Sequence, residues 1–203
     1  YNTYQELPAT WLASKEAVAR NLTDLAAGKS RILSIGCGIG FVEHHMVQIN
    51  DGAHPLTIVA LEPSIAATQW MRDPRIKLRH GLFPEAVRGE QFDFAYASNI
   101  DYCFNDVEYN RFLRTVHDFG IHDLVLTDIL VPSHGSSISS AVKAVVRSGL
   151  AKLRLYDRGQ FWGYLRSLGE HRKFLRRAGF IVIAEGKIPG AGYWLRSTIH
   201  RER

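Results

Sequence analysis

Three glycines recur at every second position in the segment ILSIGCGIG, residues 32–40. An apolar run precedes Gly36, and Gly38 and Gly40 follow before the amphipathic segment FVEHHM begins. Glycine is favoured where the backbone needs positive φ angles or where another group must approach closely, because it has no Cβ. The segment therefore predicts a strand, a tight turn and a helix, with a small-molecule pocket at the carboxyl end of a buried strand.

Strands and helices are predicted to alternate along the first two thirds of the chain. Trp11, Val18, Leu22 and Leu25 share one helical face, which predicts an N-terminal helix over about 8–27. Apolar runs predict strands at 57–61, 76–79, 92–96 and 123–130, and helices are expected at 41–49, 65–71 and 108–118. This alternation is typical of a parallel sheet covered by helices on both faces.

The last third of the chain has a different pattern. A small polar loop at 133–140 precedes two predicted helices, which together would form a lid over about 133–178; the second has Phe161, Leu165, Leu168 and Leu175 on one side. Strands at 180–184 and 193–199 follow with only a turn between them, so they must be antiparallel. We predict one domain over residues 1–203, with a Rossmann-like, doubly wound α/β fold. Its sheet is mostly parallel and seven-stranded, with an antiparallel C-terminal hairpin.

The composition is that of a globular protein, with 46% hydrophobic and 22% charged residues. No apolar stretch approaches the ~20 residues of a membrane-spanning helix, and the N-terminal residues lack the pattern of a secretory signal. We therefore expect a cytoplasmic protein without membrane contact. Cys37 and Cys103 are too few for a disulfide framework and are expected to be reduced. His44 and His45 are adjacent on a predicted helix and diverge by ~100°, so no metal site is predicted.

The net charge of +5 is unevenly distributed. Residues 143–177 contain ten basic and two acidic residues, so the rest of the chain is acidic overall. A basic face of this kind can attract an acidic substrate, a phosphate or a nucleic acid. Two amphipathic helices with solvated lysines and arginines would give the same count, and both interpretations stay open.

The glycine spacing discriminates between nucleotide ligands. A dinucleotide-binding loop has G-x-G-x-x-G, whereas here Phe41 occupies the last position and Gly40 comes one residue earlier. A phosphate-binding loop also needs a Gly-Lys-Ser/Thr sequence, which does not follow. Glu62 ends the second predicted strand, 22 residues after Gly40. A carboxylate at that place can accept hydrogen bonds from both hydroxyls of a ribose.

The ordered set of ILSIGCGIG, ALEPS, FDFAYASNIDYCF and FLRRAGF before a hairpin resembles class I S-adenosylmethionine-dependent methyltransferases over nearly the whole chain. The resemblance implies an enzyme that binds S-adenosyl-L-methionine and releases S-adenosyl-L-homocysteine. Backbone at the glycines would approach the methionine and ribose portions, an apolar wall would contact the adenine, and an N-terminal tyrosine would reach the methionine carboxylate. The implied cofactor-binding residues are Tyr4, Ser34, Gly36, Cys37, Gly38, Gly40, Glu62, Pro63, Leu82, Phe83 and Asn99.

Ser34 departs from the pattern of this family, which commonly has an acidic residue two positions before the first glycine. Serine can make hydrogen bonds but carries no negative charge. A non-catalytic cofactor-binding or scaffold protein is therefore kept as an alternative to an enzyme.

Polar residues after the fourth and fifth strands are candidates for binding the molecule that accepts the methyl group, because the carboxyl ends of parallel strands meet at one edge of the sheet. Asp101 and His134 are the candidate catalytic residues, since a general base helps to activate a hydroxyl acceptor. The candidate substrate-binding residues are Tyr102, Trp162, Arg166 and His171.

We expect methyl transfer to a small organic acceptor, for which an anionic group would suit the arginines, with oxygen favoured over nitrogen. An RNA methyltransferase that binds through the basic helices at 143–177 is the alternative. The segment ASNIDY lacks the NPPY-like sequence of enzymes that methylate exocyclic base nitrogens, which disfavours flipped-base chemistry. Monomer and homodimer are both left open.

Overall fold

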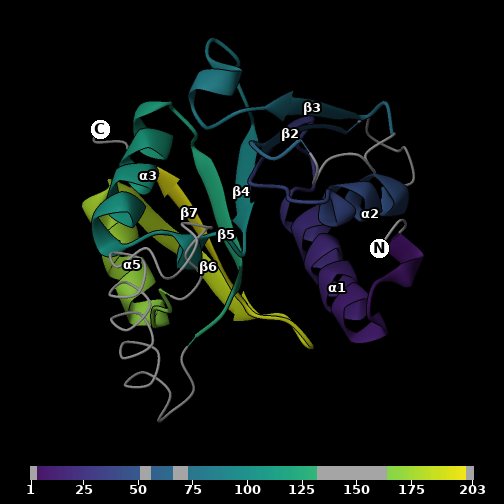
Figure 1. Ribbon diagram of the computed structural model, residues 1–203. Helices are drawn as coiled ribbons and strands as arrows, with labels where there is room; N and C mark the ends of the chain where they lie inside the picture. The colour runs from purple at the N-terminus through teal and green to yellow at the C-terminus, as the bar shows by residue number, and fades with distance from the viewer. Residues whose placement is uncertain (1–3, 51–55, 66–72, 132–163, 200–203) are drawn as a thin grey trace, which may run out of the picture.

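The computed structural model describes residues 4–50, 56–65, 73–131 and 164–199. Strands and helices alternate along the chain (Figure 1). The strands are β1 (Arg31–Ile35), β2 (Thr57–Glu62), β3 (Ile76–His80), β4 (Phe94–Ser98), β5 (Asp123–Ile129), β6 (Phe180–Lys187) and β7 (Tyr193–Ile199). The helices are α1 (Ala9–Leu25), α2 (Phe41–Ile49), α3 (Asp106–Asp118) and α5 (Leu168–Arg177), with short 3₁₀ turns η1 (Tyr4–Glu6), η3 (Glu85–Val87) and η4 (Asp101–Cys103).

These strands form one seven-stranded sheet in the order β3-β2-β1-β4-β5-β7-β6. The first five strands pair in parallel, whereas β7 is antiparallel to both β5 and β6. The predicted mostly parallel sheet with an antiparallel C-terminal hairpin is confirmed. The strand order reverses between β1 and β4, and ligands of open α/β sheets bind at such a switch point.

Helices cover both faces of the sheet (Figure 1). On one face α1 and α2 pack against residues such as Ile32 and Phe94, and on the other α3 and α5 pack against Leu33 and Ala95. Successive strand side chains point to opposite faces, so β1 and β4 supply apolar side chains to both layers. Ser34 lies two positions after Ile32 and therefore points toward α2.

Capping boxes set the starts of α3 and α5. Asn105 Oδ1 accepts a hydrogen bond from Glu108 N at 2.9 Å, and the Glu108 carboxylate accepts one from Asn105 N at 3.0 Å. Ser167 and Glu170 make the same reciprocal pair at the start of α5. The sequence predicted a helix that includes Leu165, and this boundary is wrong. Ser167 is the N-cap and Leu168 is the first helical residue, so Leu165 lies in the preceding non-helical segment.

Most predicted strand boundaries agree with the structure within one residue, and those of β4 and β6 differ by two or three. β4 begins at Phe94 instead of residue 92, because the Asp93 carboxylate accepts hydrogen bonds from Ser30 N and Arg31 N at 3.2 and 3.0 Å. β6 extends to Lys187 instead of ending at residue 184. The predicted helix at 65–71 lies mostly outside the described residues, as does most of the predicted lid. None of the described helices is long and apolar enough to cross a membrane.

We predict that Ser167→Ala lowers the free energy of unfolding by about 1 kcal/mol, the typical contribution of an N-cap side chain. The substitution removes the hydroxyl that accepts a hydrogen bond from Glu170 N. Denaturant unfolding followed by circular dichroism measures the change, with Ser64→Ala in an exposed loop as the control. Equal effects of the two substitutions would show that the cap does not stabilise α5.

Candidate active site

A large pocket lies at the carboxyl ends of β1, β2 and β4, where the glycine segment predicted it. Its volume is about 1070 Å³, which is ample for a nucleoside-sized ligand. Chain segments at 35–39, 61–64, 81–85, 98–100 and 102–104 line it. Trp11 and Lys15 of α1 and Arg111 and Phe112 of α3 also border it. The pocket therefore occupies the switch point of the sheet.

Hydrogen bonds to the end of β2 hold the glycine segment in place. Leu61 O accepts hydrogen bonds from the N–H groups of Gly36 and the next residue, at 2.9 and 3.0 Å. The Glu62 carboxylate accepts one from Gly38 N at 2.9 Å. Gly36 has a φ of +75°, and a Cβ at this position would stand 2.8 Å from Ile100 Cγ2. Both the backbone conformation and the close approach of Ile100 therefore require glycine.

The second half of the glycine segment leads into α2. Gly40 is the N-cap residue of this helix, with a φ of 73°. The Tyr4 hydroxyl donates a hydrogen bond to Ile39 O at 2.8 Å, and its ring packs edge-on against Phe41. Tyr4 and Gly40 are not among the described residues that line the pocket. Their positions indicate that they shape the loop from outside.

Glu62 stands at the carboxyl end of β2 and borders the pocket. Its Oε2 accepts a hydrogen bond from Gly38 N at 2.9 Å, and its Oε1 accepts one from Ser64 N at 3.0 Å. Two backbone N–H groups thus orient the carboxylate, while each oxygen keeps a lone pair for another donor. Pro63 lines the same part of the pocket. This arrangement can accept the two vicinal hydroxyls of a ribose.

Glu43 is a site residue that the sequence analysis missed. It lies in the first turn of α2, is 1% exposed and borders the pocket. Its Oε1 accepts hydrogen bonds from Ser34 Oγ at 2.5 Å and from the Tyr96 hydroxyl at 2.6 Å. Its Oε2 has no hydrogen-bond partner among the described residues. Burial raises the pKa of Glu43, although both hydroxyls oppose this effect.

Ser34 therefore lies beneath the pocket and contacts Glu43, and it is not among the described residues that line the cavity. The acidic group absent from β1 is present nearby on α2. The one signal in the sequence was an acidic residue in the first turn of an otherwise apolar helix segment, FVEHHM.

The remaining predicted cofactor residues line the pocket. Leu82 is 68% exposed, whereas Phe83 packs against Phe119 with ring centroids 5.1 Å apart. Asn99 has a φ of 54°, a left-handed conformation in which Asn is enriched. Its Oδ1 is buried without a partner among the described residues. Asn99 can therefore accept a hydrogen bond from a ligand.

The turn after β4 supplies Tyr102, Cys103 and Phe104 to the pocket wall. Burial raises the pKa of the Cys103 thiol to about 11, with a smaller contribution from the charge of Asp101. Neither Cys103 nor Cys37 forms a disulfide bond within the described part of the chain. Burial also raises the pKa of Cys37, so both thiols are neutral near pH 7.

Asp101, Arg166 and His171 come together, but not among the described residues that line the pocket. The Tyr109 hydroxyl and His171 Nδ1 are 2.7 Å apart, and His171 Nε2 lies 3.4 Å from Asp101 Oδ2. Burial raises the pKa of Asp101 to about 6 and lowers the pKa of His171 to about 4. Near pH 7 a buried carboxylate therefore faces a neutral imidazole. This geometry favours a structural role over the predicted contact with the acceptor.

Arg166 holds the turn after β4 from the side that faces away from the pocket. Its guanidinium group donates hydrogen bonds to Asp101 O at 2.9 Å and Phe104 O at 2.7 Å, and it pairs with Asp106 Oδ1 at 2.9 Å. It also lies 4.5 Å from the centre of the Tyr109 ring. With its side chain 3% exposed, Arg166 positions the pocket wall and does not present its charge to the cavity, which differs from its predicted contact with the substrate.

The candidate residues His134 and Trp162 lie outside the described residues. Within the described ranges, no group of three or more His, Cys, Asp and Glu side chains is placed to hold a metal ion.

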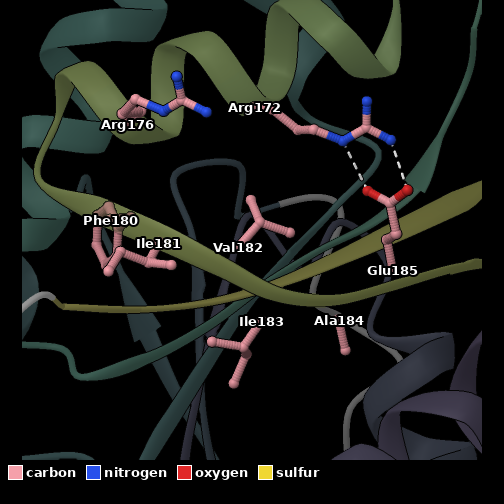
Figure 2. Close-up of a pocket in the computed structure, with 8 residues that line it drawn as sticks. All are labelled: Arg172, Arg176, Phe180, Ile181, Val182, Ile183, Ala184 and Glu185. Atoms are coloured by element: carbon pink, nitrogen blue, oxygen red, sulfur yellow. Dashed lines mark hydrogen bonds and ion pairs between the residues drawn. The ribbon is translucent and has the colours of Figure 1, made fainter.

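A smaller hollow of about 330 Å³ lies between α5 and β6, at the far edge of the sheet (Figure 2). Apolar side chains of β6 form much of its lining. The Arg172 guanidinium makes two hydrogen bonds to the Glu185 carboxylate, at 2.7 and 2.5 Å (Figure 2). Because the charges of Arg172 and Glu185 are paired with each other, we place the functional site in the larger pocket.

Several solved structures share this architecture. TnmH matches with a TM-score of 0.67 and 19% identity over 95% of this chain and 55% of its own. The mitomycin 7-O-methyltransferase MmcR matches with a TM-score of 0.69 and 18% identity, over 93% of this chain and 54% of its own. The magnesium protoporphyrin IX methyltransferase ChlM from Synechocystis was solved with bound SAH. It matches with a TM-score of 0.63 and 13% identity, over 94% of this chain and 84% of its own. The chain has the class I methyltransferase fold.

This chain spans about half the length of five of the structures that it matches, TnmH and MmcR among them. No protein-family model and no curated protein sequence matches it. Because the identities are low, the likeness shows the fold alone.

The Asp101–His171 pair makes two opposing contributions to the pH dependence of stability. The protonated form of Asp101 stabilises the fold, because its pKa rises to about 6 in the folded state; this contribution is lost as the pH increases from ~4 to about 6. The neutral form of His171 stabilises the fold, because its pKa falls to about 4; this contribution is lost as the pH decreases from ~6.5 to about 4.

In the variant Asp101→Asn, only the contribution of His171 to the pH dependence of stability remains. We therefore predict that its free energy of unfolding increases with pH, between ~4 and ~6.5, more steeply than that of the wild type. Denaturant unfolding at several pH values measures the slope, with the exposed residue Asp24 changed to Asn as the control. The same slope in wild type and Asp101→Asn would contradict the prediction.

Proposed function

We propose that this protein transfers a methyl group from S-adenosyl-L-methionine to a small organic acceptor. The position of Glu62 carries the proposal: its carboxylate ends β2, is oriented by two backbone N–H groups and borders the large pocket beside the glycine segment. The neighbours in fold support the same cofactor, since ChlM was solved with SAH and human N-acetylserotonin methyltransferase with SAM.

The pocket residues fit the separate parts of this cofactor. Glu62 would accept hydrogen bonds from the ribose hydroxyls, and Leu82 and Phe83 would contact the adenine. The glycine segment would lie along the methionine portion, where a Cβ at Gly38 would meet no atom within 4 Å, so the space beside this backbone is open. The buried Asn99 Oδ1 offers a further acceptor to a ligand donor.

The bound cofactor would supply a methyl group already activated on a sulfonium. The protein would therefore chiefly orient the acceptor and exclude water, and orientation alone can lower a reaction barrier by ~7–11 kcal/mol. Tyr102, Phe104 and Phe112 give part of the pocket an aromatic wall. Such a wall suits a flat, largely apolar acceptor molecule.

We favour oxygen as the methylated atom, with His134 as the general base. Histidine titrates near neutral pH, and His134 follows β5, which is the parallel neighbour of β4 in the sheet. Asp101 is less suited to this task because its carboxylate faces the buried His171. The neighbours in fold include both an O-methyltransferase and an N,N-dimethyltransferase, so they favour neither atom.

Two observations weigh against the alternatives to this proposal. Glu43 provides a buried carboxyl group beside Ser34, which reduces the reason for a non-catalytic scaffold. Arg166 is enclosed by backbone carbonyls and Arg172 pairs with Glu185, so these two members of the basic segment do not offer free charges to RNA.

We predict that Glu62→Ala weakens the binding of S-adenosylhomocysteine by about 10- to 100-fold, because hydrogen bonds to a charged group contribute ~1.5–3 kcal/mol. Isothermal titration calorimetry measures the dissociation constant. Glu185→Ala, at the far edge of the sheet, serves as the control and should bind like the wild type. Wild-type protein that binds neither S-adenosylmethionine nor S-adenosylhomocysteine would overturn the proposed function.

With radiolabelled S-adenosylmethionine, we predict methyl transfer to hydroxylated aromatic compounds and a reduction of ~100-fold or more in His134→Ala, the usual range for loss of a general base. Amines and RNA serve as competing acceptors in the same assay. Transfer to amines alone would exclude oxygen as the methylated atom. Transfer to RNA that weakens steeply with salt would favour the RNA alternative.

A further inference from the structure

A cluster of two hydroxyls and one carboxyl lies between α2 and the sheet, under the glycine segment. Ser34 of β1 and Tyr96 of β4 are register partners in adjacent parallel strands. Both hydroxyls donate hydrogen bonds to the same oxygen, Oε1 of Glu43. The three side chains belong to residues that are at most 1% exposed. The two donors therefore hold the carboxyl group in one orientation.

The second carboxyl oxygen of Glu43 is left without a partner. Oε2 is buried and has no hydrogen-bond partner among the described residues. Leaving a buried polar atom without a hydrogen-bond partner is unfavourable, and more so when the group is charged. Glu43 also borders the large pocket, so a ligand in that pocket is a source of the missing donor.

The charges around Glu43 favour a cationic donor. Lys15 is the cation whose charge lowers the pKa of Glu43, and its ammonium group is already ion-paired with Asp128. Tyr4 and Cys37 also lie within electrostatic range, and burial raises the pKa of each, so both are neutral near pH 7. In its ionised form Glu43, together with Asp128 and Lys15, leaves an excess negative charge here. A ligand carboxylate would increase this charge, whereas a ligand ammonium group would neutralise it and favour the ionised form of Glu43.

We propose that Glu43 Oε2 accepts a hydrogen bond from the ammonium group on the methionine portion of the cofactor. The inference rests on the proposed function, because it needs a ligand that carries an amino acid group. The N–H bonds of the ammonium satisfy the unpartnered oxygen, and its charge compensates the buried carboxylate. Ser34 is then a positioning residue that acts on the cofactor through Glu43.

The test compares two ligands that differ in one group: S-adenosylhomocysteine and its analogue with hydrogen in place of the amino group. Isothermal titration calorimetry gives the affinity of each ligand for wild type, Glu43→Gln and Glu185→Gln. We expect the wild type to prefer the amino-bearing ligand by about tenfold or more. Glu43→Gln has the same shape but no charge and should reduce the preference to about threefold or less, whereas Glu185→Gln should retain it.

Glu43→Asp keeps the charge and should retain part of the preference, and circular dichroism verifies that each variant is folded. Comparable affinity of the wild type for both ligands would overturn the inference and leave the proposed function standing; this comparison needs no variant. A folded Glu43→Gln with the full wild-type preference would also overturn it. Failure of the wild type to bind either ligand would overturn the proposed function, and the inference with it.

Discussion

The hydrogen bonds between the end of β2 and the glycine segment are the constraint on which the site depends. Leu61 O and the Glu62 carboxylate together accept three backbone N–H groups from the loop that leaves β1. The loop therefore cannot move without disturbing Glu62, which also borders the pocket. The same loop ends at Gly40, where α2 begins in the direction that brings Glu43 over Ser34. One set of local bonds thus determines the positions of two carboxyl groups in the pocket.

The sequence predicted the order of the elements well, because burial on a sheet face and on a helix face leaves different periodicities. Gly36 and Glu62 could also be found, since a turn residue and a strand end are local features. The start of α5 was missed because the apolar spacing continues back to Leu165, while the capping box at Ser167 decides where the helix begins. Local hydrogen bonding here outweighs hydrophobic periodicity.

The direction of polar side chains was much less predictable. Placing Asp101 at the carboxyl edge was correct, but the η4 turn directs its carboxylate to His171 in the interior. Glu43, in contrast, was not expected at the site, because an acidic residue in the first turn of a helix is ordinarily explained by the helix dipole. Its burial depends on hydroxyls of Ser34 and Tyr96, which come from two separate strands. Such convergence is a property of the tertiary structure and leaves no spacing in the sequence.

The place of β7 in the sheet has a consequence for how the chain folds during synthesis. β7 is the last of the seven described strands along the chain, yet it lies inside the sheet, between β5 and β6 (Figure 1). Until β7 leaves the ribosome, β5 has no partner on one side and β6 has no strand to join. The parallel half that contains the pocket can assemble earlier, since β1 to β5 pair among themselves. During that interval β5, with its buried apolar residues, is an exposed edge open to pairing with other chains.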